Sequence, residues 1–99
     1  MVAAVVFREK RAILNSQTGQ LAIAEIRIWR IPRSLHYPEG RKFSLFLVCD
    51  GKTVVGMDNH RPKGPHLHLG EGETVYKYRG DERLVSDFWD LVRKGGFEP

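Results

Sequence analysis

Residues 42–58 read K-F-S-L-F-L-V-C-D-G-K-T-V-V-G-M-D, and this stretch decides the fold. Polar and apolar residues alternate from Lys42 to Cys49, which predicts a β-strand. Asp50 and Gly51 tolerate positive φ and so favour a tight two-residue turn into a second strand, Lys52 to Asp58. A β-hairpin is therefore expected at the centre of the chain.

The residues before this hairpin predict two further strands. Ala3 to Phe7 is a short β-like run, and Asn15 to Gly19 carries a turn signal. Gln20 to Ile31 is rich in β-branched and aromatic residues and is partly apolar on both faces. We expect this strand to be covered on one face and partly on the other, by a helix or by a second chain, as in a homodimer. Pro32 to Gly40 is expected to be a loop.

The residues after the hairpin predict a last strand and a helix. Thr74 to Arg79 is expected to be the strand, with Tyr76 and Tyr78 on one face. Residues 81–94 are expected to be helical, with Asp81 as N-cap and Gly95 as the left-handed C-terminal cap. An apolar stripe runs along this helix: Leu84, Phe88, Leu91 and Val92. The sequence predicts one α+β domain over residues 1–99, in which a twisted antiparallel sheet of about five strands packs one C-terminal helix on one face.

Composition and charge narrow the functional classes. The longest apolar runs, such as Phe43 to Cys49, are far shorter than the ~20 residues of a membrane helix, and the N-terminal residues do not resemble a signal peptide. We therefore expect a cytoplasmic protein with no membrane association. The lone Cys49 cannot form an internal disulfide and is expected to be buried. The net charge of +4 favours an anionic partner such as nucleic acid.

Residues 56–70, G-M-D-N-H-R-P-K-G-P-H-L-H-L-G, contain three of the four histidines. Two prolines and a glycine predict a loop in its middle, after which His66-Leu67-His68 resumes an extended conformation. Alternate residues of a strand point to the same side, so His66 and His68 are expected to face one site about 7 Å apart. The functional site is predicted in this segment.

Three interpretations of the two histidines remain open. They could act as general base and general acid on a phosphodiester without a metal, with Asp58 orienting one imidazole and Arg61 and Lys63 stabilising the phosphate charge. They could bind a divalent metal ion, with Asp58 or His60 as a third ligand. They could also be polar residues on an exposed strand or at a subunit contact.

Basic and polar residues outside the pair suggest further contacts. Arg27 and Arg30 recur in the second strand and could bind nucleic acid, although such charges often form a solvated face. Asn59 is expected to bond its own backbone at the strand exit. Tyr76 and Tyr78 are expected to line the sheet face that the histidines occupy.

Beyond these patterns, the chain resembles the TumE-type toxin family of prokaryotic toxin-antitoxin loci. The resemblance rests on Met57-Asp58-Asn59, Lys63-Gly64 and His66-Leu67-His68 at this spacing. It extends to Val75-Tyr76-Lys77-Tyr78 and Asp87-Phe88, and to F-R-E-K and I-W-R-I-P nearer the start. It implies a toxin role opposed by a cognate antitoxin and assigns no catalytic residues.

Together these observations predict a toxin that acts on RNA, as a metal-independent endoribonuclease in which His66 and His68 carry the acid/base chemistry. The alternative is a non-catalytic module that binds nucleic acid or protein through a basic sheet face. A nuclease that uses a divalent metal held by Asp58, His60, His66 and His68 is the third candidate.

Overall fold

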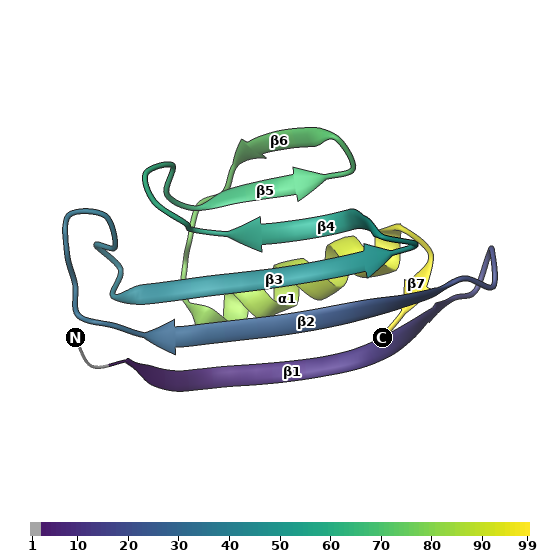
Figure 1. The fold of residues 1–99 in the computed structure, drawn as a ribbon, viewed down its shortest axis with the longest axis horizontal. Helices are drawn as coiled ribbons and strands as arrows, with labels where there is room; N and C mark the ends of the chain where they lie inside the picture. The colour runs from purple at the N-terminus through teal and green to yellow at the C-terminus, as the bar shows by residue number, and fades with distance from the viewer. Residues whose placement is uncertain (1–2) are drawn as a thin grey trace.

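The computed structural model describes residues 3–99 as one curled antiparallel sheet with a single helix on one side (Figure 1). The chain forms β1 (Ala4–Asn15), β2 (Leu21–Arg30), β3 (Arg41–Cys49), β4 (Lys52–Asp58), β5 (His66–Leu69), β6 (Gly72–Val75), α1 (Asp81–Lys94) and β7 (Phe97–Glu98). The strand order is β6-β5-β4-β3-β2-β1-β7, so β1 to β6 form a simple meander and β7 returns beside β1. The α+β class and the C-terminal helix are confirmed.

The sheet has seven strands in the described residues rather than about five. The first strand extends to Asn15 instead of ending at Phe7, because its charged residues are tolerated on a strand at the edge of the sheet. The predicted turn at Asp50-Gly51 is confirmed, with φ of 54° and 73°. β7 escaped prediction because it is two residues long and pairs only with Leu14 and Asn15.

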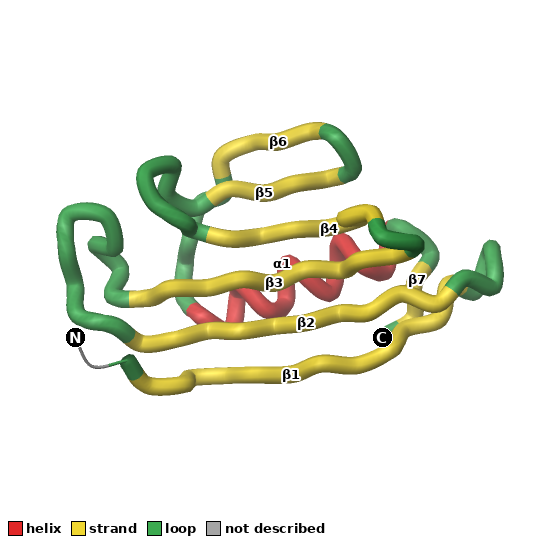
Figure 2. Tube along the Cα trace, viewed as in Figure 1, coloured by secondary structure: helices red, strands yellow, loops and turns green. Residues whose placement is uncertain are grey.

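The hydrophobic core lies between α1 and one face of the sheet (Figure 2). Alternate side chains of the central strands point into it: Ala22, Ala24, Ile26 and Ile28 from β2, and Phe43, Leu45, Leu47 and Cys49 from β3. Leu84, Phe88 and Val92 of the helix are fully buried against them, as the apolar stripe predicts. Leu91, predicted in the same stripe, is half-buried.

Both predicted helix caps are displaced by one residue. The N-cap is Gly80, and Asp81 is the first helical residue. The Asp81 carboxylate instead accepts hydrogen bonds from the Tyr78 hydroxyl (2.6 Å) and Arg41 Nε (3.0 Å). Gly95 has a right-handed conformation, and Gly96, with φ of 92°, takes the left-handed one. The helix start is thus anchored to β3 and to the preceding segment by side chains.

The predicted strand over residues 74–79 is wrong beyond Val75. Residues 76–80 leave the sheet and pass to the helix side, where the Tyr76 hydroxyl donates to Asp87 Oδ2 (2.6 Å). The Tyr78 ring stacks on Phe43 of the core, with centroids 5.8 Å apart. Burial and these hydrogen bonds raise the pKa of both tyrosines. The tyrosines therefore stabilise the helix and do not line the face of the histidines.

Two expectations from composition can be compared with the described residues. The helix in this part of the chain is neither long nor apolar enough to span a membrane. Cys49 is buried at the end of β3, as expected.

Candidate functional site

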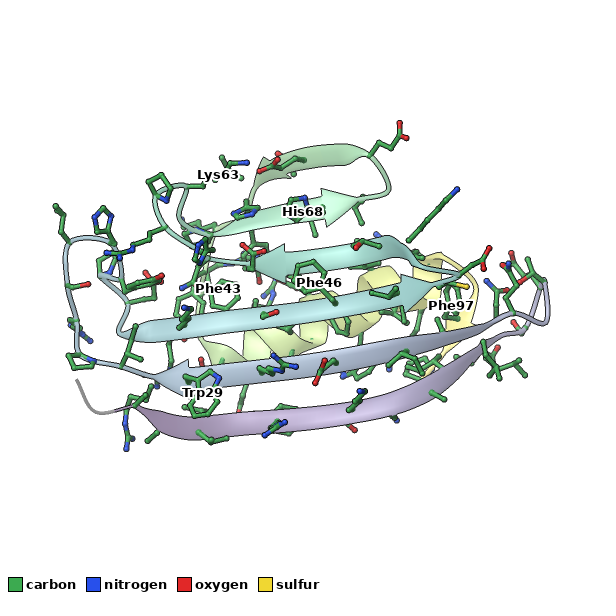
Figure 3. The ribbon with its side chains drawn as sticks, in the orientation of Figure 1. Trp29, Phe43, Phe46, Lys63, His68 and Phe97 are labelled. Atoms are coloured by element: carbon green, nitrogen blue, oxygen red, sulfur yellow. The ribbon has the colours of Figure 1, made fainter. Side chains whose placement is uncertain are left out.

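The face of the sheet opposite α1 is open and carries the histidine pair. In the β4–β5 register Asp58 lies opposite His66 and Gly56 opposite His68, so all four residues share one face. The same rows continue into β3, where Ser44 pairs with Asp58 and Phe46 with Gly56. Figure 3 shows His68 on β5 and Phe46 on β3 near each other across β4. The predicted extended conformation of residues 66–68 is present in β5.

Asp58, His66 and His68 form a compact cluster. One ligand atom from each lies within 4.8 Å of the others. The Asp58 Oδ1 to His66 Nε2 distance is 2.9 Å, and the two imidazole rings meet edge to face with centroids 4.7 Å apart. The structure therefore brings the three residues of the predicted acid/base site together.

His66 is held by acceptors on both sides of its ring. Nδ1 lies 2.8 Å from the carbonyl oxygen of Gly64, and Nε2 lies against the Asp58 carboxylate. A carbonyl oxygen and a carboxylate oxygen are hydrogen-bond acceptors, so both ring nitrogens of His66 face oxygen acceptors. The residue is 8% exposed, which fixes its orientation. His68 is half-buried and forms no side-chain hydrogen bond within residues 3–99.

Glu73 is a member of the site that the sequence did not indicate. It lies on β6 opposite His68, its Oε1 is 2.8 Å from Lys63 Nζ, and the same oxygen is 3.9 Å from His66 Nε2. The hydrogen bond from Lys63 outweighs burial and lowers the pKa of Glu73. Gly70 and Glu71 form the turn between β5 and β6. A prediction of this turn from the sequence would have placed Glu73 opposite His68 and so indicated that Glu73 belongs to the site.

The four predicted phosphate-binding residues are not gathered in one place. Lys63 lies beside the histidines and pairs with Glu73. Arg61 lies at the end of the sheet, where it lines a hollow with Lys42 and His36. Arg27 is on the open face and donates two hydrogen bonds to Glu25, whereas Arg30 belongs to the opposite face. The predicted basic face built on Arg27 and Arg30 is therefore divided between the two sides of the sheet.

Of the four residues predicted as alternative metal ligands, three lie together in the structure. His60, the fourth, is exposed and is not among the clustered ligands, which are Asp58, His66 and His68. Its backbone N–H bonds to Asp58 Oδ1 at 3.2 Å. His60 therefore contributes its backbone, rather than its imidazole, to the orientation of Asp58.

Asn59 positions the site from within the core. It is fully buried, and its Nδ2 donates to the Arg41 carbonyl and to Glu39 Oε1, both at 2.7 Å. Its Oδ1 accepts from the Phe43 backbone N–H at 2.9 Å. The expected bond to its own backbone is not formed. Asn59 instead fastens the end of β4 to the start of β3 and so fixes the adjacent Asp58.

Comparison with known proteins identifies the family. The family model described as Toxin TumE matches residues 3–95, which include every strand and residue of the site just described except β7. No protein in the curated set and no solved structure matches the chain significantly. The matched span covers nearly the whole sequence, so the chain belongs to the TumE toxin family.

Proposed function

We propose that this toxin-family chain is a metal-independent endoribonuclease that cleaves RNA with His66 and His68. The observation that carries the proposal is the pairing of a doubly bonded His66 with an unbonded His68 on the open sheet face. Two imidazoles in different environments suit the two opposite proton transfers of phosphodiester cleavage. Membership of a toxin family implies an antitoxin partner that restrains this activity.

His68 and His66 take different roles in the proposed reaction. His68, which is half-buried on the open face, acts as the general base that removes the proton of the ribose 2′ hydroxyl, and the 2′ oxygen attacks the adjacent phosphorus. The bond from phosphorus to the 5′ oxygen then breaks, which leaves a 2′,3′-cyclic phosphate. His66, oriented by Gly64 and Asp58, stabilises the negative charge on the phosphorane and acts as the general acid that gives a proton to the departing 5′ oxygen.

The remaining charges support substrate binding. Lys63 lies on the loop before β5, beside His66 and Glu73, and its ammonium can reach a phosphate oxygen on leaving Glu73. Both partners of that ion pair are exposed, so water screens their attraction and they separate readily. Arg61, at the end of the sheet, would contact a phosphate further along the RNA.

A metal-dependent nuclease is the second candidate, and one observation favours it. The Gly64 carbonyl accepts from His66 Nδ1, which is the usual arrangement when the other ring nitrogen binds a metal. However, Nε2 is 2.9 Å from Asp58 Oδ1, whereas two ligands around a tetrahedral zinc lie roughly 3.3 Å apart, given bonds of about 2.0–2.1 Å. The shorter separation fits a hydrogen bond between the two side chains and is too short for two ligands of a tetrahedral zinc.

The test uses purified protein and single-stranded RNA. His66→Ala and His68→Ala are each expected to lower the cleavage rate about 10²- to 10⁴-fold, the usual contribution of general acid/base groups. His60→Ala is the matched control, because the His60 imidazole is exposed and lies outside the cluster, and only its backbone N–H contacts Asp58. The RNA product is expected to end in a cyclic phosphate, the rate to pass through a maximum with pH, and a chelator to leave the rate unchanged.

Three results would contradict this mechanism. Loss of cleavage in chelator with recovery on addition of a divalent ion would establish the metal-dependent alternative. Cleavage by the folded His66→Ala, His68→Ala double variant would remove both histidines from the chemistry. Growth arrest on induction of that double variant in bacteria, with intact total RNA, would favour a non-catalytic module that binds nucleic acid or protein.

A further inference from the structure

The ring of Phe46 covers strand β4 at a glycine. A Cβ built on Gly56 would lie 2.5 Å from Cε1 and 2.8 Å from Cδ1 of Phe46, closer than real carbon atoms approach. The ring can therefore occupy its position against β4 only because residue 56 has no side chain. The Cδ1–Cε1 side of the ring lies over Gly56, and Phe46 is half-buried on the open side of the sheet.

Phe46 is next to the histidine pair. It lies in the same cross-strand row as Gly56 and His68, and the Phe46 and His68 ring centroids are 6.3 Å apart with 30° between the planes. Figure 3 shows Phe46 on the side of β3 that faces the viewer, near His68. Phe43 and Phe88, by contrast, are buried on the helix side. Phe46 thus presents an aromatic surface at the site where the others fill the core.

We propose that Phe46 is a stacking platform for a nucleobase of the substrate. A base on its outward face would place the ribose and phosphate of that nucleotide over His68 and His66. Every nucleobase has an aromatic face, so such a platform binds single-stranded RNA without selecting its sequence. This inference rests on the proposed ribonuclease function and names how its substrate is held.

The neighbours of Phe46 suit a base better than a phosphate. Glu25 lies opposite Phe46 on β2, and its carboxylate is 2.8 Å from Arg27 Nη2. The hydrogen bond from Arg27 lowers the pKa of Glu25, so the carboxylate is charged and compensates the guanidinium. The β2 side of the platform therefore carries a closed ion pair with no net charge. Phosphate charge is met on the other side, at His66 and Lys63.

The experiment compares two ligands on a protein that cannot cleave them. The His66→Ala, His68→Ala variant is titrated with a single-stranded RNA of about ten nucleotides and with an abasic ribose-phosphate oligomer of the same length. The base-containing RNA is expected to bind about 5- to 150-fold more tightly, the ratio that a stacking energy of about 1–3 kcal/mol produces. A further Phe46→Leu substitution in this variant is expected to remove most of the difference in affinity between the two oligomers. Phe46→Tyr is expected to preserve that difference.

Val48→Ala is the matched control, because Val48 is exposed on the same face of the same strand and lies outside the site. Equal affinity for the two oligomers, or a ratio unchanged by Phe46→Leu, would overturn the platform and leave the ribonuclease in place. Absence of both RNA binding and RNA cleavage at low salt would overturn both. If Phe46→Leu fails to fold, the abasic comparison and Phe46→Tyr still decide.

Discussion

The two faces of the sheet differ in what they stabilise. On β2, Ile26 points to the helix and is 0% exposed, whereas Ile23, three residues earlier, points to the open face and is 44% exposed. The same contrast runs through β3, where Leu45 and Leu47 fill the core and Ser44 and Phe46 lie near the histidines. The helix side therefore holds the fold together, and the open side can carry polar chemistry without weakening it.

This comparison predicts its largest effect for substitutions of isoleucine on β2. Ile26→Ala is expected to lower the free energy of unfolding by about 2–5 kcal/mol, because it removes buried methyl groups and leaves a cavity. Ile23→Ala on the open face is the matched control and is expected to cost about 0.5 kcal/mol or less. Urea denaturation of both variants measures the difference. Equal costs would mean that a partner or second copy buries the open face in solution.

Asn59→Ala is expected to give the next largest effect, about 1–3 kcal/mol, because it leaves the Phe43 N–H and the Arg41 carbonyl without their partner in the core. RNA cleavage is expected to fall as well, since Asp58 is the last residue of β4, at the end of the strand that Asn59 fastens. His60→Ala, at the exposed neighbouring position, should change neither quantity. Denaturation and cleavage rates at neutral pH test this link between core and site. A stable Asn59→Ala protein would contradict it.

Tyr76→Phe is expected to cost about 1 kcal/mol at neutral pH, because the half-buried hydroxyl bonds to Asp87. The raised pKa of Tyr76 also gives this cost a pH dependence. Its stabilisation is fully present below the unfolded value near 10 and is lost as pH rises toward the folded value, because the unfolded chain ionises first. The gap in stability between wild type and Tyr76→Phe should therefore narrow in alkaline solution. A constant gap up to strongly alkaline pH would refute this.

The smallest expected effect is a difference in the salt dependence of RNA binding between variants of two arginines on β2. If RNA binds the open face, Arg27→Gln should reduce the log-log salt slope of binding by at most about 0.7, the value for one single-strand phosphate. Arg30→Gln should leave the slope unchanged, because Arg30 belongs to the opposite face. Fluorescence titration at several salt concentrations measures both slopes. A larger effect of Arg30 would place the RNA on the helix side.

The parts of the fold that local pattern determines could be predicted from the sequence. Alternation and Asp50-Gly51 predicted the central hairpin, and the helical spacing of Leu84, Phe88 and Val92 predicted the helix and its buried stripe. The caps, by contrast, depend on tertiary contacts: Asp81 bonds to Tyr78 and Arg41 rather than to its own helix. The strand after Val75 was wrong for the same reason, since the hydroxyls of Tyr76 and Tyr78 bond to Asp87 and Asp81 of the helix.

In the candidate site, too, local pattern predicted some residues and tertiary contacts determined the others. Two-residue spacing was enough to place His66 and His68 on one side of a strand. Asp58 was predicted from its place in the same segment, whereas strand pairing was needed to bring in Glu73 from β6, and the sequence does not state that register. The division of Arg27 and Arg30 between opposite faces was visible in the alternation itself. The prediction of one basic surface rested on the net charge, which does not tell on which side of a strand a residue lies.

The hairpin of β5 and β6 should open more readily than the rest of the sheet. Every residue of β6 is exposed, and α1 packs on β3, β4 and β7 rather than on this hairpin. Local opening of such an edge costs less free energy than global unfolding. Backbone amides of Leu67 and Thr74 should therefore exchange with deuterium sooner than those of Leu45. Opening would carry both histidines away from Asp58, so the toxin should lose activity at denaturant concentrations that leave its helix and central strands intact.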